Sequence, residues 1–157
     1  MDDPGLTKHF LRRLGEAGIG AGRVRLLGAS AHAEHLKIYH EVDVGLDPFP
    51  QGGGMSTAEA LWMGVPVVSL SGATVPSRAS ASILAALQMH DWIAESDQAY
   101  VRIAVAAARD LERLARTRSE MRARLAGSAF GDAERYTRAV EAAYREMWRR
   151  WCAEAQA

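Results

Sequence analysis

The chain has 157 residues, of which 48% are hydrophobic, and its 19 lysines and arginines balance 19 aspartates and glutamates. This apolar content excludes a disordered chain, and the length suits one domain with a sizeable core. Because the charges balance, neither nucleic acid nor a membrane surface is expected as a main partner.

The location of the protein is constrained by what the sequence lacks. Cys152 is the single cysteine, so no disulfide can form within the chain, and a cytoplasmic location is expected. No apolar run approaches the roughly 20 residues that span a bilayer. The acidic start, Met-Asp-Asp-Pro, has no apolar run behind it and is not expected to be a signal peptide.

The first part of the chain, up to about Ala94, alternates apolar runs with helical patterns. Helical spacing predicts helices over residues 6–17, 33–40, 56–63 and 80–87. Short apolar runs predict strands over residues 24–27, 42–47, 65–70 and 92–94. This alternation predicts an α/β fold whose parallel sheet is covered by helices on both faces.

From Glu95 onward the pattern is almost entirely helical, with helices expected over residues 98–117, 119–125 and 132–151. On the last helix, apolar residues at spacings of three or four predict a packing face. They are Tyr136, Val140, Tyr144, Met147 and Trp151. We expect residues 1–94 to form the core and residues 95–157 a helical extension of the same domain.

A glycine-rich loop, Gln51–Gly54, follows the strand expected over 42–47 and precedes the helix expected over 56–63. In open α/β sheets, ligands bind beyond the carboxyl ends of the strands. Glycines before a helix N-terminus let backbone N–H groups approach an anion, which suits a diphosphate. The alternative is an ordinary turn and a capped helix, because Ser56 and Glu59 have the spacing of a capping box.

Two other side chains, Glu59 and His35, have two possible roles each. Glu59 could be the capping carboxylate, or it could accept the hydroxyls of a ribose. His35 could stack on a base, or it could be a surface or packing residue, and His32 lies on a similar face. Without a nearby Asp or Cys partner, the two histidines make a poor metal site, so no metal is expected.

Several stretches in a fixed order resemble one known family. They are residues 35–47 (HLKIYHEVDVGLD), 60–70 (ALWMGVPVVSL), 77–82 (SRASAS) and the terminal helix from Tyr136 to Trp148. Together they resemble the SPINDLY-type protein O-GlcNAc transferases over nearly the whole chain. The resemblance implies a Rossmann-like parallel sheet, the C-terminal half of a GT-B fold, followed by C-terminal helices.

The family is often fused to tetratricopeptide repeats and moves N-acetylglucosamine, or fucose in some plant members, from a nucleotide diphosphate sugar to Ser or Thr of proteins. The resemblance implies UDP-GlcNAc as the donor, acceptor proteins as partners, and no metal or other cofactor. It places His35 on the uracil, the backbone around Ala31 and His32 on the base, and Lys37 near the same pocket.

The same resemblance places Gly53, Gly54, Met55 and Ser56 around the diphosphate and moves Glu59 from a cap to the ribose hydroxyls. The family loop often carries His or Gly followed by two threonines. Here it reads Gly54-Met55-Ser56, so one hydroxyl is missing.

The family's preceding strand, its phosphate-contacting lysine, its N-terminal domain with the candidate base and its repeats are all expected before Met1. No catalytic residue is therefore expected in this chain. We expect it to be the donor-binding part of a transferase, incomplete alone. The alternative is a non-catalytic nucleotide-binding or helical interaction module left from a truncated gene.

Overall fold

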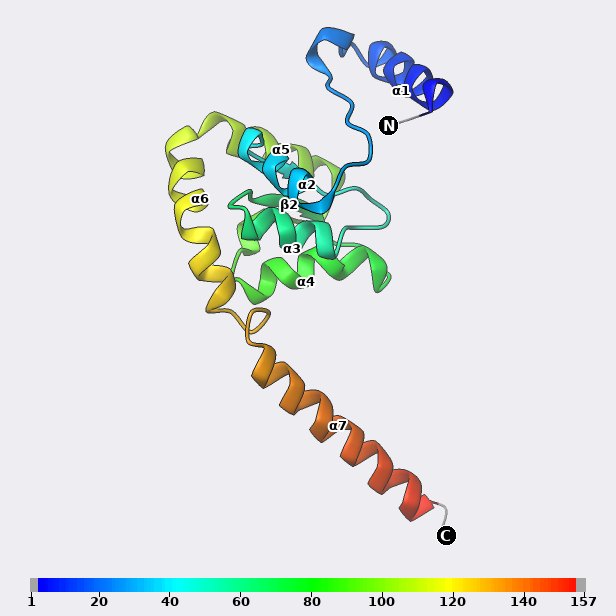
Figure 1. Cartoon of the computed structure of the whole chain (residues 1–157), viewed down its shortest axis with the longest axis vertical. Helices are drawn as coiled ribbons and strands as arrows, with labels where there is room; N and C mark the ends of the chain where they lie inside the picture. Colours follow the sequence, from blue (N-terminus) through cyan, green and yellow to red (C-terminus); the bar gives the residue numbers. More distant parts are fainter. Residues whose placement is uncertain (1–2, 155–157) are drawn as a thin grey trace. The chain divides into compact units, whose positions relative to one another are not determined.

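The structure is a computed structural model that describes residues 3–154 (Figure 1). Residues 1 and 2, half of the acidic start that argued against a signal peptide, lie outside the described residues. The chain divides into two compact units, residues 1–37 and residues 38–157. Among the helices in the described range, none is both long enough and apolar enough to cross a membrane.

The first unit holds helix α1 (Pro4–Glu16), the short turn η1 (Ala21–Arg23) and most of helix α2 (His32–Ile38). The carboxylate of Asp3 caps α1 by accepting from the N–H of Gly5 at 2.7 Å and of Leu6 at 3.1 Å. Both helices were predicted from their spacing, with ends that differ by one or two residues.

The strand predicted over residues 24–27 is wrong, because these residues adopt no regular structure. A strand exists only where its backbone pairs with a neighbour. The N–H of Val24 instead closes the η1 turn onto the carbonyl of Ala21 at 3.0 Å.

The second unit is built on a parallel sheet of strands β1 (Gly45–Leu46), β2 (Val67–Leu70) and β3 (Ile93–Ala94), in the order β1-β2-β3. Gly45 pairs with Val67 and Ser69 with Ile93. Helices α3 (Met55–Trp62) and α4 (Ala79–Ala86) make the connections, with short turns η2 (Tyr39–Glu41), η3 (Pro76–Arg78) and η4 (His90–Trp92) between elements. The predicted α/β class is confirmed.

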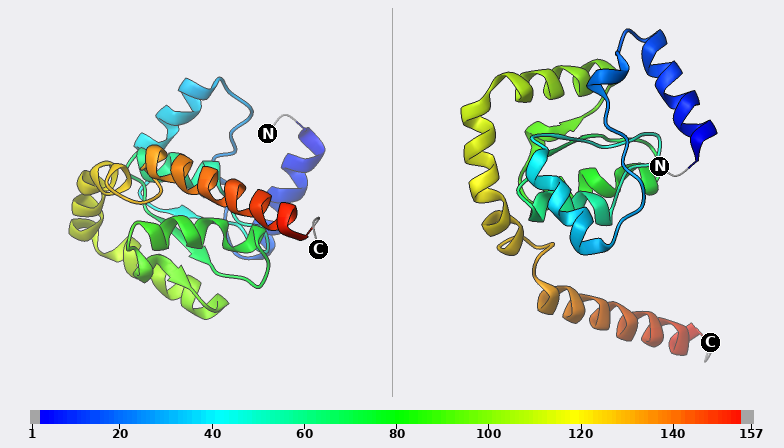
Figure 2. Two further views of the ribbon diagram at one scale, coloured as in Figure 1. Left: turned by 90° about the horizontal axis from the view of Figure 1, so that it is seen from below. Right: turned by 45° about the horizontal axis from the view of Figure 1, so that its top comes forward.

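Helices α3 and α4 lie on one side of this sheet and α5 (Asp97–Arg109) on the other, as the views in Figures 1 and 2 show. Helix α6 (Leu111–Ala126) packs against both α3 and α5. The core between them is made of buried apolar side chains. The largest fully buried ones include Leu61, Val65, Val68, Leu84 and Met121.

The boundary between the two helices after β3 differs from the prediction. A break was expected at Arg118, yet the chain breaks at Asp110, whose carboxylate accepts from the N–H of Arg113 at 2.9 Å and caps α6. An aspartate at an N-cap satisfies a donor that the helix cannot. Arg118 lies inside α6, where its guanidinium donates to the carbonyls of Val42 and Tyr39.

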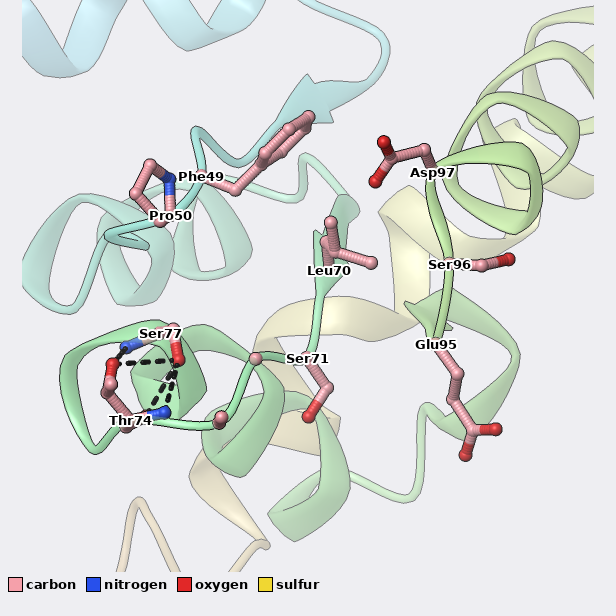
Figure 3. Close-up of a pocket in the computed structure, with 11 residues that line it drawn as sticks. Phe49, Pro50, Leu70, Ser71, Thr74, Ser77, Glu95, Ser96 and Asp97 are labelled. Atoms are coloured by element: carbon pink, nitrogen blue, oxygen red, sulfur yellow. Dashed lines mark hydrogen bonds between the residues drawn. The ribbon is translucent and has the colours of Figure 1, made fainter.

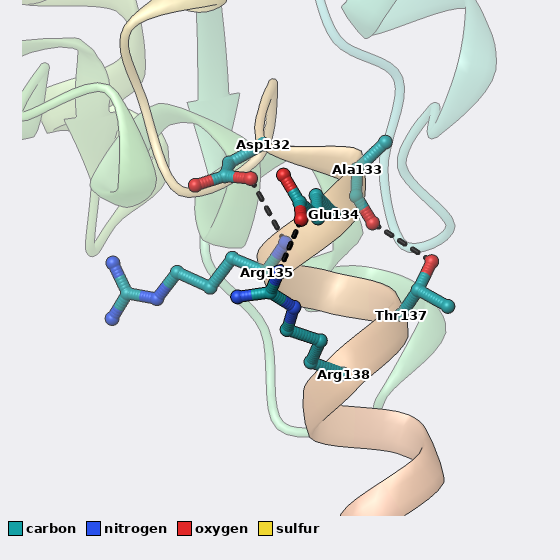
Figure 4. A network of polar contacts seen from close by, with 6 residues as sticks. All are labelled: Asp132, Ala133, Glu134, Arg135, Thr137 and Arg138. Carbon is teal, nitrogen blue, oxygen red and sulfur yellow. Dashed lines mark hydrogen bonds and ion pairs between the residues drawn. The ribbon is translucent and has the colours of Figure 1, made fainter.

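Helix α7 (Ala133–Glu154) confirms the helix predicted over residues 132–151, beginning one residue later and ending three residues later. The Asp132 carboxylate accepts from the N–H of Arg135 at 2.9 Å, the Thr137 hydroxyl donates to the carbonyl of Ala133, and Arg138 pairs with Glu134 (Figure 4). These contacts all lie within the first turns. Helix α7 is therefore stabilised locally, by its own cap and side-chain pairs.

The apolar stripe of α7, predicted to be a packing face, is not packed in this structure. None of the described side chains of α7 is buried. Tyr136, Tyr144, Met147 and Trp151 each keep more than half of their surface exposed, and the rings of Trp148 and Trp151 stack at 5.2 Å. The pattern identified an apolar face correctly but could not identify what covers it.

Candidate functional site

The carboxyl ends of the three strands open onto one cavity of about 420 Å³. Its lining comes from the segments that follow β1, β2 and β3, as expected for a ligand site in a parallel sheet. The lining residues are Phe49, Pro50, Leu70, Ser71, Gly72, Ala73, Thr74, Ser77, Glu95, Ser96 and Asp97. Sequence reasoning missed this cavity, although the rule that ligands bind at strand ends could have indicated the loops after β2 and β3.

The cavity has an apolar side and an acidic side (Figure 3). Phe49 and Pro50 face Asp97 across it, with Leu70 between them. The Phe49 ring meets the Tyr100 ring edge to face, with centroids 5.6 Å apart. The loop after β2 is fixed by Ser77, whose hydroxyl donates to the carbonyl of Thr74 at 2.8 Å and accepts from its N–H at 3.0 Å.

Beside this cavity, the glycine-rich loop is held by a network of buried polar side chains. Asp47, only 4% exposed, follows β1. Its Oδ1 accepts from the N–H of Gly53 at 2.7 Å, and its Oδ2 accepts from the hydroxyl of Ser69 on β2 at 2.8 Å. The Ser80 hydroxyl on α4 donates to the carbonyl of Gly53 at 2.6 Å and lies 2.8 Å from the Thr57 hydroxyl.

The three glycines of the loop have different surroundings. A methyl group on Gly52 would lie 2.7 Å from Asp47 Oδ2, and one on Gly53 would lie 2.6 Å from Ser56 Oγ. Both distances are shorter than packing allows. A methyl group on Gly54 would meet no atom within 4 Å. Packing therefore explains Gly52 and Gly53, whereas Gly54 borders open space.

The N-terminus of α3 lies directly after this open position. Gly54 is the N-cap, and no side chain caps the helix. The predicted capping box is wrong, because Ser56 is the second helical residue rather than the cap, and Glu59 falls in the second turn. The bonds that fix Gly53 set the helix start at Met55, two residues earlier than the box requires.

An uncapped helix start offers backbone N–H groups and a partial positive charge. Met55 and Ser56 are both exposed here. The expected phosphate contacts at Gly53, Gly54, Met55 and Ser56 are therefore brought together, although the Gly53 N–H already donates to Asp47. The geometry suits an anion that lies over Gly54.

Glu59 lies near Tyr39, which precedes β1. The Tyr39 hydroxyl donates to the carbonyl of Ser56 at 3.3 Å. Burial and, to a smaller extent, the Glu59 carboxylate raise the pKa of Tyr39. A second hollow of about 180 Å³ beside β1 is lined by Tyr39, Ser56 and Thr57 among others.

The residues expected at the base lie in the first unit, on and just before α2. Ala31 precedes the helix, and its carbonyl accepts from the N–H of His35 at 2.9 Å. His32 and His35 lie about one turn apart on α2, and His35 is half-buried. The Lys37 ammonium donates to Glu34 at 2.7 Å. The structure thus places these four residues together; their contact with a base stays a prediction.

Within residues 3–154, no group of three His, Cys, Asp or Glu side chains lies close enough together to hold a metal ion. The polar groups at the strand ends are carboxylates, hydroxyls and backbone amides. This set can hold an anion at the N–H groups of α3 and sugar-like hydroxyls at the carboxylates.

Comparison with known proteins gives a consistent result. A model described as Glycosyl transferase family 41 matches residues 6–140. The chain is 36% identical over 148 residues to a probable UDP-N-acetylglucosamine–peptide N-acetylglucosaminyltransferase SPINDLY of Oryza sativa subsp. japonica. It is 31% identical to the SPINDLY protein of Arabidopsis thaliana. Both matches cover 94% of this chain and 16% of the relative, so the chain spans about a sixth of these relatives' length.

A solved structure matches as well. A mutant O-GlcNAc transferase of Thermobaculum terrenum superposes with a TM-score of 0.89 and 36% identity, over 98% of this chain and 29% of that one.

A UDP-N-acetylglucosamine–peptide N-acetylglucosaminyltransferase of Caenorhabditis elegans is 28% identical over 144 residues, which is 92% of this chain and 12% of the relative.

Proposed function

Because the chain belongs to glycosyl transferase family 41, we propose that it forms the part of a protein O-GlcNAc transferase that binds the nucleotide-sugar donor. In this proposal residues 1–94 are the nucleotide-sugar-binding core, and residues 95–157 are its helical extension. The donor is UDP-GlcNAc, the acceptors are Ser and Thr hydroxyls of cytoplasmic proteins, and no cofactor takes part.

The observation that carries the proposal is the uncapped N-terminus of α3 with open space over Gly54. The N–H groups of Gly54, Met55 and Ser56 would donate to the diphosphate there. During transfer, the acceptor oxygen bonds to the anomeric carbon, and the bond from that carbon to the diphosphate breaks. The leaving diphosphate gains negative charge, which fixed N–H donors and the helix dipole stabilise.

The other site residues are assigned by similarity. His35 would stack on the uracil, the backbone of Ala31 and His32 would meet its edge, and Lys37 would lie near the same pocket. Glu59 would accept the ribose hydroxyls. In this proposal the acceptor proton passes to a base in the other half of the GT-B enzyme, where the acceptor also binds.

Calorimetric titration of the 157-residue chain with UDP and ADP tests this function. We expect weak binding of UDP and much weaker binding of ADP, because the diphosphate contacts are common to both and the base contacts are not. Gly54→Asp is the matched control, since it adds a negative charge in open space and should abolish UDP binding. Equal affinity for UDP and ADP, or no binding of either, would contradict the proposal.

A further inference from the structure

We propose that Asp47 is a positioning residue for the donor site, and that its buried carboxylate aims the backbone of the glycine loop at the diphosphate. The inference rests on the proposed function, because it assigns a role within that site. Asp47 is 4% exposed and both of its carboxylate oxygens accept hydrogen bonds from the chain. It therefore acts through the loop and does not touch the donor.

Three hydrogen bonds to other parts of the chain hold Asp47 in place, one to its carboxylate and two to its backbone. The Ser69 hydroxyl of β2 donates to its Oδ2 at 2.8 Å, and the Tyr100 hydroxyl of α5 donates to its backbone carbonyl at 2.9 Å. Its own backbone N–H donates to the carbonyl of Val68 at 3.0 Å. The carboxylate is thus held by the sheet, so the Gly53 N–H that it binds at 2.7 Å is held by the sheet as well.

This anchoring sets the direction of the next N–H along the chain. The carbonyl of Gly53 accepts from the Ser80 hydroxyl, and Ser80 is completely buried. A trans peptide group is planar, with its N–H opposite to its C=O. Because the Gly53 carbonyl points into the protein, the Gly54 N–H of the same peptide group points out, toward the open space over Gly54.

The glycine run follows from the same contact. Gly52 and Gly53 lie so close to Asp47, Ser56 and Thr57 that neither position has room for a methyl group. The two glycines let the backbone reach the carboxylate. A carboxylate close to a phosphate site repels the ligand, so its presence there is explained by the bond to the loop and not by its charge.

The test separates the contribution of the diphosphate to the binding affinity from the contribution of the nucleoside. NMR titrations of the 157-residue chain with uridine and with UDP give two Kd values. The Kd for uridine divided by the Kd for UDP reports the diphosphate contacts. In Asp47→Ala we expect this ratio to fall by about tenfold or more, since hydrogen bonds to charged groups are lost. The Kd for uridine should stay unchanged.

Asp47→Asn is the conservative variant, because its Oδ1 can still accept from Gly53 and its amide can donate to Ser69. We expect it to keep the wild-type ratio within about threefold, as a retained hydrogen bond predicts. Met121→Ala, a buried substitution on α6, is the control for stability and should lower Tm without changing the ratio. If Asp47→Ala does not fold, Ser69→Ala frees the carboxylate on one side and should lower the ratio by a smaller factor.

The outcomes distinguish the two proposals. A wild-type chain that binds UDP no more tightly than uridine would contradict the proposed function itself. A wild-type chain that prefers UDP, with the same ratio in Asp47→Ala (or in Ser69→Ala where Asp47→Ala is unfolded), would overturn the positioning role. Equal losses in Asp47→Asn and Asp47→Ala would also overturn it, because the variant that keeps the hydrogen bond to Gly53 would then bind no better than the variant that loses it.

Discussion

Single residues of the glycine loop have roles that differ between neighbours. Gly53→Ala places a methyl group 2.6 Å from Ser56 Oγ and 2.9 Å from Thr57 Oγ1. We expect it to lower the free energy of unfolding by about 1–3 kcal/mol, as overpacking does. Gly54→Ala meets open space but replaces the N-cap glycine of α3, so we expect a smaller loss of about 1 kcal/mol or less.

Urea unfolding and UDP titration of both variants check this pair. Gly54→Ala should lower the affinity for UDP, because its methyl group occupies the space over the N-terminus of α3. A Gly54→Ala variant that binds UDP as the wild type does would show that no ligand approaches this position.

Tyr100, on α5, supports the loop. Its ionisation makes the free energy of unfolding depend on pH in the alkaline range. Burial and, to a smaller extent, the Asp47 carboxylate raise the pKa of Tyr100 above 10.0. The unfolded chain therefore ionises this tyrosine first. The stabilisation is fully present below pH 10 and is lost as the pH rises through the folded pKa.

Tyr100→Phe should lower the free energy of unfolding at pH 7 by about 0.5–1.5 kcal/mol, because the hydrogen bond to the Asp47 carbonyl is lost. Above pH 10 its stability should fall less steeply than in the wild type, and the remaining fall includes Tyr39. Urea unfolding from pH 7 to pH 11 measures both effects. Tyr144→Phe on α7, where the ring is exposed, should match the wild type throughout.

At the scale of elements, local patterns predicted the helices and most strands, because periodicity is a property of neighbouring residues. The predictions that failed concerned features that depend on residues distant in the sequence. Residues 24–27 have the composition of a strand but adopt no regular structure. Asp47 could be predicted as a strand end, whereas its role depends on Ser69, 22 residues away.

Asp110 and Asp132 are matched caps on helices with different surroundings. Each accepts from the N–H three residues later at 2.9 Å. Helix α6 buries Leu114, Met121 and Leu125, whereas α7 has no buried side chain among its described residues. A cap contributes to global stability only where its helix unfolds together with the core.

Asp110→Ala should therefore lower the free energy of unfolding by about 0.5–2 kcal/mol. Asp132→Ala should reduce helical circular dichroism at 222 nm, since helix ends fray without caps, and leave the main thermal midpoint unchanged. Thermal scans of both variants provide the comparison. Equal shifts of the midpoint would show that α7 unfolds with the core.

At the scale of the whole molecule, the resemblance to SPINDLY-type transferases that the sequence predicted is confirmed. The chain spans 16% of its rice relative and 29% of the solved transferase. Order along the sequence, not any single motif, made this prediction possible. The exact contacts of the donor could not be predicted, because the residues expected at the base and at the diphosphate lie in separate units.

We predict no transfer of N-acetylglucosamine by the 157-residue polypeptide alone. A GT-B active site lies between two halves, and the chain spans only 29% of the solved transferase. The check is an assay with labelled UDP-GlcNAc and a mixed peptide library, with Gly54→Asp as the background. Turnover above that background would show that these residues contain a complete active site.

The hydrogen bond from the Gly53 N–H to Asp47 affects how fast the amide hydrogens of the loop exchange in deuterated water. Its N–H is held on Asp47, while those of Gly54, Met55 and Ser56 begin a helix that offers them no partner. We expect one slowly exchanging amide next to three rapidly exchanging ones. Addition of UDP should slow those three and leave the Gly53 amide as it was, so the loop's amides report occupancy of the site without a substitution.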